Sequence, residues 1–208
     1  MNTPHNPTGK VFTREELEEI TSILKDFPDC MVLADEVYDF LTYDGLEHTR
    51  FATIGDNWNR TVTVYSGGKK FNATGWKVGW AIGHQKLVRL GGILNNTSFY
   101  CQNTPGQVAM AQALRHAEQH ELESDGSSTF LNTAKANFTE VRDYLTQELM
   151  DMPLPWEPLS VESGYFLMAD ITKCRDLIGK KFLESHDYED DKNGTPAPHH
   201  PLYMPGTK

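Results

Sequence analysis

The sequence has few cysteines, no long apolar run and no excess of basic residues. Its three cysteines lie about seventy residues apart, so they form no close pair of the kind that a metal knuckle or a redox dithiol requires. No apolar run approaches the roughly 18 residues of a membrane span, and the N-terminus has no hydrophobic signal region. A formal charge of −10, from 29 acidic and 19 basic residues, argues against nucleic acid or an anionic membrane as a partner. We therefore expect an intracellular protein with no nucleic-acid or membrane partner.

The length of 208 residues predicts one large domain, or a domain with an appendage. A hydrophobic content of 38% and a charged content of 23% are typical of globular proteins. A Pro-rich connection, MPLPWEP, then separates two blocks of sequence. We expect a large domain over residues 1–155 and the start of a smaller C-terminal domain over residues 156–208.

The clearest predicted helix covers residues 13–27. Thr13 can cap it, and Glu16 follows three residues later, as in a capping box. Apolar residues recur on one face at Leu17, Ile20, Leu24 and Phe27. Further helices are predicted over residues 105–120 and 128–150, the second from apolar residues at helical spacing.

Several short stretches are typical of strands. CMVLADEVYDF begins with a continuous apolar run, as expected of a strand buried on both faces of a parallel sheet, and it ends in acids. RTVTVYSGGKK alternates Thr and Val before its glycines, and GWKVGWAIGH resembles a further strand. Strands interleaved with helices predict an α/β fold with a mostly parallel sheet and flanking helices. Ligands of such a sheet gather outside the carboxyl ends of its strands.

The C-terminal part of the chain gives weaker signals. ESGYFLMADI is a strand candidate that could open the smaller domain, and an irregular tail rich in Pro, Gly and His follows Glu184. His199 and His200 could ligate a metal, but a neighbouring pair in a Pro-rich loop is more often solvated. We therefore predict no metal site.

Four stretches fall on loops or strand ends: HNPTG at 5–9, ADEVY at 34–38, SGGK at 66–69 and GWK at 75–77. Each one alone is an ordinary turn, cap or loop. Together, their order and spacing resemble the pyridoxal-phosphate-dependent aminotransferases of class I and II, which have the aspartate aminotransferase fold. The sequence is similar to the kynurenine aminotransferase branch, also called glutamine transaminase K or cysteine-S-conjugate β-lyase. The segments that carry this similarity are NTPHNPTGKVF, ADEVYDFLTYDG, SGGKKFNATGWKVGW and SGYFLMADI.

The resemblance implies one binding site for pyridoxal 5′-phosphate, formed by Asn6, Asp35, Tyr38, Ser66, Lys69 and Lys77. Asp35 suits a protonated pyridine nitrogen, since opposite charges in contact attract by about 4 kcal/mol at an intermediate dielectric. Asn6 and Tyr38 can hydrogen-bond the phenolic oxygen of the cofactor.

The phosphate and the reactive aldehyde of the cofactor need other groups. Ser66 supplies a hydroxyl to the phosphate, and the following glycines let backbone N–H groups approach it. Lys77 adds a charge where most of the superfamily carries Arg. Lys69 is the expected catalytic residue, which forms the imine with the cofactor. Its neighbour Lys70 is expected to point away, as a surface or structural lysine.

The implied reaction moves an amino group from an amino acid of kynurenine, glutamine or aromatic type to a 2-oxo acid, with one lysine as the general base. Elimination from a substrate with a β leaving group is a possible side activity. The segment NNTSFYCQNTPGQ resembles a stretch that places aromatics near the substrate, which makes Phe99 and Tyr100 weak candidates beside core or interface packing. Enzymes of this family are homodimers, and the resemblance implies a cytoplasmic or mitochondrial location.

Parts of the family pattern do not occur in this sequence. The phosphate turn and stacking aromatic that precede N-P-x-G in the family are absent, as is the C-terminal Arg that clamps the substrate carboxylate. We therefore expect this polypeptide alone to have weak transaminase activity or none. The alternative is a non-catalytic, aminotransferase-derived subunit with a structural or interaction role.

Overall fold

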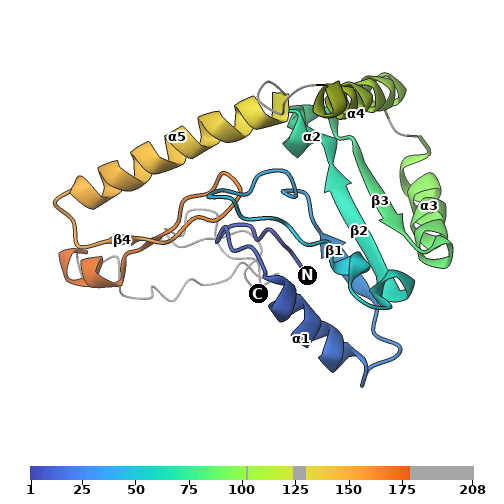
Figure 1. Ribbon diagram of the computed structural model, residues 1–208, viewed down its shortest axis with the longest axis horizontal. Coiled ribbons are helices and arrows are strands. Elements are labelled where there is room, and N and C mark those ends of the chain that lie inside the picture. The colour runs from blue at the N-terminus through green and yellow to red at the C-terminus, as the bar shows by residue number, and fades with distance from the viewer. Residues whose placement is uncertain (102, 124–129, 179–208) are drawn as a thin grey trace, which may run out of the picture.

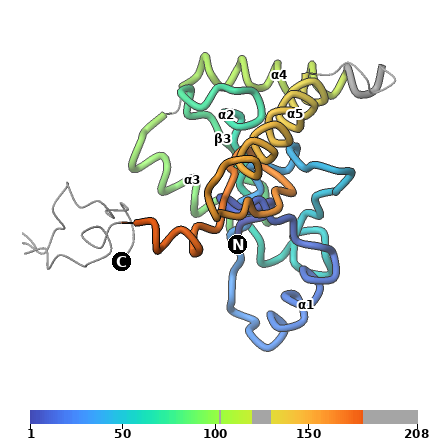
Figure 2. The backbone as a smooth tube through the Cα atoms, turned by 90° about the vertical axis from the view of Figure 1, so that its left-hand side faces the viewer, coloured from blue at the N-terminus to red at the C-terminus, as the bar shows by residue number. Residues whose placement is uncertain are grey.

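The computed structural model describes residues 1–101, 103–123 and 130–178. Its main elements are α1 (Arg14–Leu24), β1 (Val32–Asp35), β2 (Thr61–Ser66), α2 (Gly67–Lys70), β3 (Gly79–Gly83), α3 (Gln85–Phe99), α4 (Thr104–Glu123), α5 (Phe130–Asp151), β4 (Glu157–Pro158) and β5 (Ala169–Asp170). Short 3₁₀ helices are η1 (Phe51–Thr53), η2 (Asn57–Arg60), η3 (Thr74–Trp76) and η4 (Thr172–Leu177). Helix α1 lies on the opposite side of the molecule from α4 and α5 (Figure 1, Figure 2).

The central sheet has three strands in the order β1-β2-β3. Strands β1 and β2 are parallel, with Val32 opposite Thr61, whereas β2 and β3 are antiparallel, with Ser66 opposite Gly79. The sheet is therefore mixed, with β3 as its antiparallel strand. After β2 the chain turns straight back through α2 and η3, and no crossover helix returns it to the other end of the sheet, as a parallel partner would require.

Helix α1 forms as its N-terminal residues predict. The Thr13 hydroxyl accepts a hydrogen bond from the Glu16 N–H at 3.2 Å, and the Glu16 carboxylate accepts one from the Thr13 N–H at 2.9 Å. The buried Leu17 packs with Phe51 and Ile54 in the first of two core clusters. The helix ends at Leu24, so Phe27 lies beyond its apolar face and is 57% exposed, contrary to the prediction.

Strand β1 is covered on one face only. Ala34 is fully buried, but Leu33, which points to the opposite face, is 60% exposed. The prediction that this strand is buried on both faces is therefore wrong, since among the described residues no element covers the Leu33 side chain.

The second core cluster joins α5 to the segments after β1 and before β5. Leu41, Tyr43 and Val161 are its buried members, and Phe138 of α5 packs against them. The predicted helix over 128–150 is confirmed as α5, and the one over 105–120 as α4. Helix α3 was not predicted, and its Leu90, Ile93 and Leu94 are exposed.

The segment ESGYFLMADI is mostly irregular, contrary to the strand predicted for it. Only Ala169–Asp170 forms a strand, which pairs with Glu157–Pro158 in a separate two-stranded sheet. The rest is held by non-local hydrogen bonds, since Ser163 Oγ donates to the carbonyl of Gly9 at 2.7 Å and the Val11 N–H donates to the Glu162 carboxylate at 2.8 Å.

The predictions for the C-terminal tail, for a metal site and for the domain boundary have different outcomes. The irregular tail after Glu184, with His199 and His200, lies outside the described residues. Within the described ranges, no three His, Cys, Asp or Glu side chains gather as a metal site would need, and no helix has the length and apolar character of a membrane span. The domain boundary near residue 155 stays a prediction.

The contribution of the α1 capping box to stability can be tested by substitution of Thr13. Thr13→Ala should lower the free energy of unfolding by about 1 kcal/mol, because the first turn loses a side-chain acceptor. Thr13→Ser should keep most of it, and Ser22→Ala, at an exposed position in the same helix, serves as the control. Urea unfolding followed by circular dichroism measures all three. If Thr13→Ala unfolds at the same urea concentration as the unchanged chain, the cap does not stabilise the protein.

Candidate active site

The predicted site residues meet at the carboxyl ends of β1 and β2. The N-terminal segment lies beside β1 as a parallel bridge, in which the Thr3 N–H donates to the Asp35 carbonyl at 3.1 Å and the Asp35 N–H donates to the Met1 carbonyl at 2.9 Å. This pairing places the turn that contains Asn6 next to the end of β1. Within that turn the Asn6 N–H donates to Asn2 Oδ1 at 2.7 Å.

Asp35 is the last residue of β1 and is partly buried. It is opposite Val64 in the parallel register, and Ser66 follows two residues later on β2. Because alternate residues of a strand point to one face, Asp35, Val64 and Ser66 lie on the same face of the sheet. The sheet thus brings the predicted acid and the predicted hydroxyl to one edge and one face.

Tyr38 lies in the turn that follows β1, and its side chain is almost completely buried. Its hydroxyl is also buried and makes no hydrogen bond of good geometry in the part of the chain that the structure describes. Burial raises the pKa of Tyr38, and the nearby charge of Asp35 raises it further, whereas the Asn6 side chain near the hydroxyl has a smaller opposite effect. The phenol is therefore protonated at neutral pH, with the Asn6 side chain near its hydroxyl.

Lys69 is carried by α2, the single helical turn after β2. Its Nζ lies 5.8 Å from the centre of the Tyr38 ring and 5.9 Å from the centre of the Tyr165 ring. The two rings meet edge to face, with centres 5.1 Å apart. An ammonium within about 6 Å of an aromatic face is attracted to it, so these rings hold the Lys69 side chain in one place.

The two glycines before Lys69 are needed for close packing. A Cβ on Gly67 would overlap the side chain of Met110 in α4, and a Cβ on Gly68 would lie 2.7 Å from Thr74 Cα. The sequence suggested a different reason for these glycines, the approach of backbone to a phosphate. Here the backbone of α2 is packed against its neighbours at both positions.

Ser66 and Lys77 also come to the same edge of the sheet. Ser66 is opposite Gly79, and the Gly67 N–H donates to the Val78 carbonyl at 3.1 Å, one residue after Lys77. Lys77 is exposed, in the left-handed region with φ 55°. The two residues that are predicted to hold the phosphate are thus neighbours across the β2–β3 turn.

Phe99 and Tyr100 do not belong to this group of side chains. They lie at the C-terminal end of α3, beside the strand furthest from β1 (Figure 1), and both are largely exposed. Neither ring is one of the two that face Lys69. Their contact with a substrate stays a prediction.

Tyr165 was not proposed as a site residue from the sequence. It comes from the segment between Val161 and Leu167, and its hydroxyl donates to the Lys69 carbonyl at 3.5 Å. Burial raises its pKa, and so does the neighbouring Tyr38, so it too stays protonated at neutral pH. The only sequence signal was its place in SGYF, a motif that the family resemblance includes.

A buried carboxylate supports the turn after β1. Glu36 is fully buried, and its two oxygens accept hydrogen bonds from the Phe51 N–H at 3.0 Å and the Tyr65 hydroxyl at 3.1 Å. His48 Nε2 lies 3.0 Å from the oxygen that accepts from Tyr65. Glu36 therefore fixes the backbone between Asp35 and Tyr38 from the face opposite the site.

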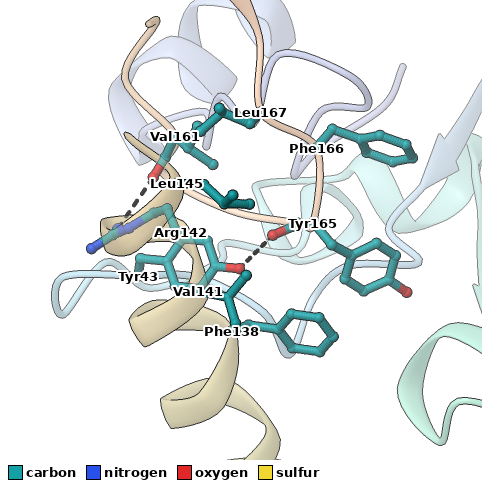
Figure 3. Close-up of a pocket in the computed structure, with 10 residues that line it drawn as sticks. Tyr43, Phe138, Val141, Arg142, Leu145, Val161, Tyr165, Phe166 and Leu167 are labelled. Carbon is teal, nitrogen blue, oxygen red and sulfur yellow. Dashed lines mark hydrogen bonds between the residues drawn. The ribbon is translucent and has the colours of Figure 1, made fainter. Parts of the chain in front are cut away.

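A small cavity lies on the other side of Tyr165, with a volume of about 100 Å³ (Figure 3). Its wall is mostly apolar, and its one cation, Arg142, is paired with Asp44 at 2.7 Å. Ligand pockets are usually about 300–1,000 Å³. This cavity is too small for a cofactor with its substrate.

Comparison with known proteins agrees with this geometry. A family model described as "Aminotransferase class I and II" matches residues 1–186. Kynurenine–oxoglutarate transaminase 1 of Mus musculus is 40% identical over 173 residues, which are 83% of this chain and 39% of the relative. The kynurenine–oxoglutarate transaminase of Dictyostelium discoideum is 39% identical over 174 residues, which are 82% of this chain and 37% of the relative. This chain thus spans about two fifths of the length of these relatives.

Solved structures give the same fold. The N-succinyldiaminopimelate aminotransferase of Mycobacterium tuberculosis matches with a TM-score of 0.69 and 30% identity, over 79% of this chain and 40% of that one. A mutant of Thermus thermophilus aspartate aminotransferase matches with a TM-score of 0.72 and 26% identity, over 83% of this chain and 42% of that one. The expected aspartate aminotransferase fold is therefore confirmed for the part of it that is present. The chain belongs to the class I and II aminotransferase family.

Proposed function

We propose that this chain is part of a pyridoxal-phosphate-dependent aminotransferase, which moves an amino group from an amino acid to a 2-oxo acid. The observation that carries the proposal is the Lys69 amine, which lies beside two tyrosine rings at the sheet edge where Asp35 and Ser66 share a face. The names of the relatives support kynurenine as one amino donor, beside the glutamine and aromatic amino acids that the sequence suggests.

The residues present suit pyridoxal 5′-phosphate as the cofactor. Within the described residues, the buried Tyr38 hydroxyl has the Asn6 side chain near it but makes no hydrogen bond of good geometry. A buried hydroxyl that is poorly paired is costly unless a ligand accepts its hydrogen bond. The phenolic oxygen of the cofactor is such an acceptor. Asp35, partly buried on the same edge, offers a carboxylate for a protonated pyridine nitrogen.

The bound cofactor would supply an electron sink for the substrate carbanion. In this chain, the Asp35 carboxylate holds the proton at the ring nitrogen, because opposite charges in contact attract by about 4 kcal/mol at an intermediate dielectric. Tyr38 donates its hydrogen bond, while Ser66 and Lys77 hold the phosphate. Lys69 Nζ would take a proton from the substrate and return it, as general acid–base catalysis requires.

The proposal extends to the whole protein. Residues 1–155 would belong to the cofactor-binding large domain and residues 156–208 would begin a smaller domain, a division that the separate β4–β5 sheet supports. The complete protein would be a homodimer, with Phe99 and Tyr100 near the substrate of the neighbouring subunit. Substrates with a β leaving group would undergo elimination as a side reaction.

A covalent test identifies the reactive lysine. After incubation with pyridoxal phosphate and reduction with borohydride, peptide mass analysis should find the adduct on Lys69, and Lys69→Arg should remove it. Lys173→Arg, at an exposed lysine paired with Glu157, is the matched control and should leave the adduct in place. If Lys69 carries no adduct, the enzyme proposal fails, and a structural or interaction subunit becomes the better explanation.

The role of Asp35 can be measured separately through cofactor affinity. Asp35→Asn should weaken pyridoxal phosphate binding about 10-fold or more, because hydrogen bonds to charged groups contribute roughly 1.5–3 kcal/mol. Asp26→Asn, at an exposed position after α1, controls for the loss of one negative charge. Titration of the cofactor absorbance gives both affinities. Equal affinities for the two variants would argue against Asp35 as the partner of the ring nitrogen.

A further inference from the structure

Lys70, the neighbour of Lys69, forms a buried ion pair with Asp39. Lys70 Nζ lies 3.0 Å from Asp39 Oδ1 and 3.2 Å from Asp39 Oδ2. Only 15% of the Lys70 side chain and 6% of the Asp39 side chain are exposed. The ammonium also lies 5.6 Å from the centre of the Phe40 ring. Lys70 is thus a structural lysine, as one of the two sequence interpretations held, and it is not a surface residue.

Asp39 belongs to the turn that carries the cofactor-facing residues. It directly follows Tyr38, and its N–H donates to the Glu36 carbonyl at 3.0 Å. Arg50 lies on its other side, with a guanidinium nitrogen 3.6 Å from Asp39 Oδ2. The Lys70–Asp39 pair therefore connects α2, which carries Lys69, to the turn between Asp35 and Tyr38.

Helix α2 has four residues, its N-cap Ser66 makes no side-chain capping hydrogen bond, and one turn of helix is not stable by itself. Its first residues are packed at Gly67 and Gly68, and the ion pair of Lys70 is a further attachment at its C-terminal end. Between them, the Lys69 carbonyl accepts a long hydrogen bond, at 3.5 Å, from Tyr165. The ion pair at 3.0 Å is the shorter of these two side-chain attachments near Lys69.

We propose that Lys70 is a positioning residue: its ion pair with Asp39 holds α2 against the turn that follows β1, so that the Lys69 amine stays beside the rings of Tyr38 and Tyr165. This inference rests on the proposed function, because it concerns the reactivity of Lys69. Lys70 itself does not touch the reacting atoms.

Breaking the Lys70–Asp39 pair can affect both the reactivity of Lys69 and the stability of the protein, and suitable variants separate the two effects. Lys70→Met keeps much of the side-chain length but removes the charge, which leaves a buried carboxylate with Arg50 as its remaining cation. Asp39→Asn combined with Lys70→Met removes both buried charges and leaves Arg50, whose side chain is 56% exposed to water. Such a double variant regains stability without regaining the attachment.

The first measurement is the rate at which the borohydride-fixed adduct forms on Lys69 with pyridoxal phosphate. Lys70→Met should slow it about 10-fold or more, because small displacements of a reacting group are costly in rate. Lys70→Arg should stay within about 3-fold of the unchanged chain, since it keeps the charge near Asp39. Lys173→Met, which removes an exposed ion pair, should leave the rate unchanged. Equal rates for Lys70→Met and Lys70→Arg would overturn the proposal.

Thermal unfolding of the same variants separates positioning from simple stabilisation. The Asp39→Asn/Lys70→Met chain should unfold at a higher temperature than Lys70→Met, yet its adduct should still form slowly. If its rate recovers together with its unfolding temperature, the pair acts only through stability and the positioning role is wrong.

A measurement without cofactor distinguishes a failure of this inference from a failure of the proposed function. Acetylation of Lys69 by an amine-reactive reagent, followed by peptide mass analysis, should change several-fold in rate in Lys70→Met and stay the same in Lys173→Met. An unchanged rate in Lys70→Met would contradict the positioning role. Absence of any pyridoxal phosphate adduct in the unchanged chain would instead contradict the proposed function alone.

Discussion

The parallel pairing of β1 with β2 is the constraint on which the candidate site depends. Its register sets Asp35 opposite Val64, so that Ser66 and the α2 turn begin beside the end of β1. A slip of one residue would move every side chain of one strand to the other face. The buried carboxylate of Glu36, which accepts from the backbone of η1 and from Tyr65 of β2, fixes the chain just after this register.

The sequence predicts the parts of this structure whose signals are local. Thr13 and Glu16 are three residues apart and hydrogen-bond within one turn, so the start of α1 could be found from the residues alone. The ends of β1 and β2 were predicted because apolar or alternating runs stop at acids or glycines. The position of Lys69 followed from a short motif, and its neighbours Asp35 and Ser66 do lie at one sheet edge.

Features set by distant residues could not be predicted in the same way. The antiparallel direction of β3 depends on how α2 and η3 turn the chain back, and the exposure of Leu33 depends on which elements cover the sheet. Tyr165 meets Lys69 across nearly a hundred positions of sequence. The Lys70–Asp39 pair spans the two strand ends, and either residue alone resembles an ordinary surface charge.

Asp35 and Lys69 are both partly buried, but their surroundings differ. The Lys69 amine lies beside the rings of Tyr38 and Tyr165, and Tyr165 packs against the second core cluster. Asp35 instead shares its face with the exposed Leu33. Charge pairs weaken where water has access, because the effective dielectric is higher. We therefore expect the proposed pairing of Asp35 with a ring nitrogen to strengthen where the Leu33 face is covered from water.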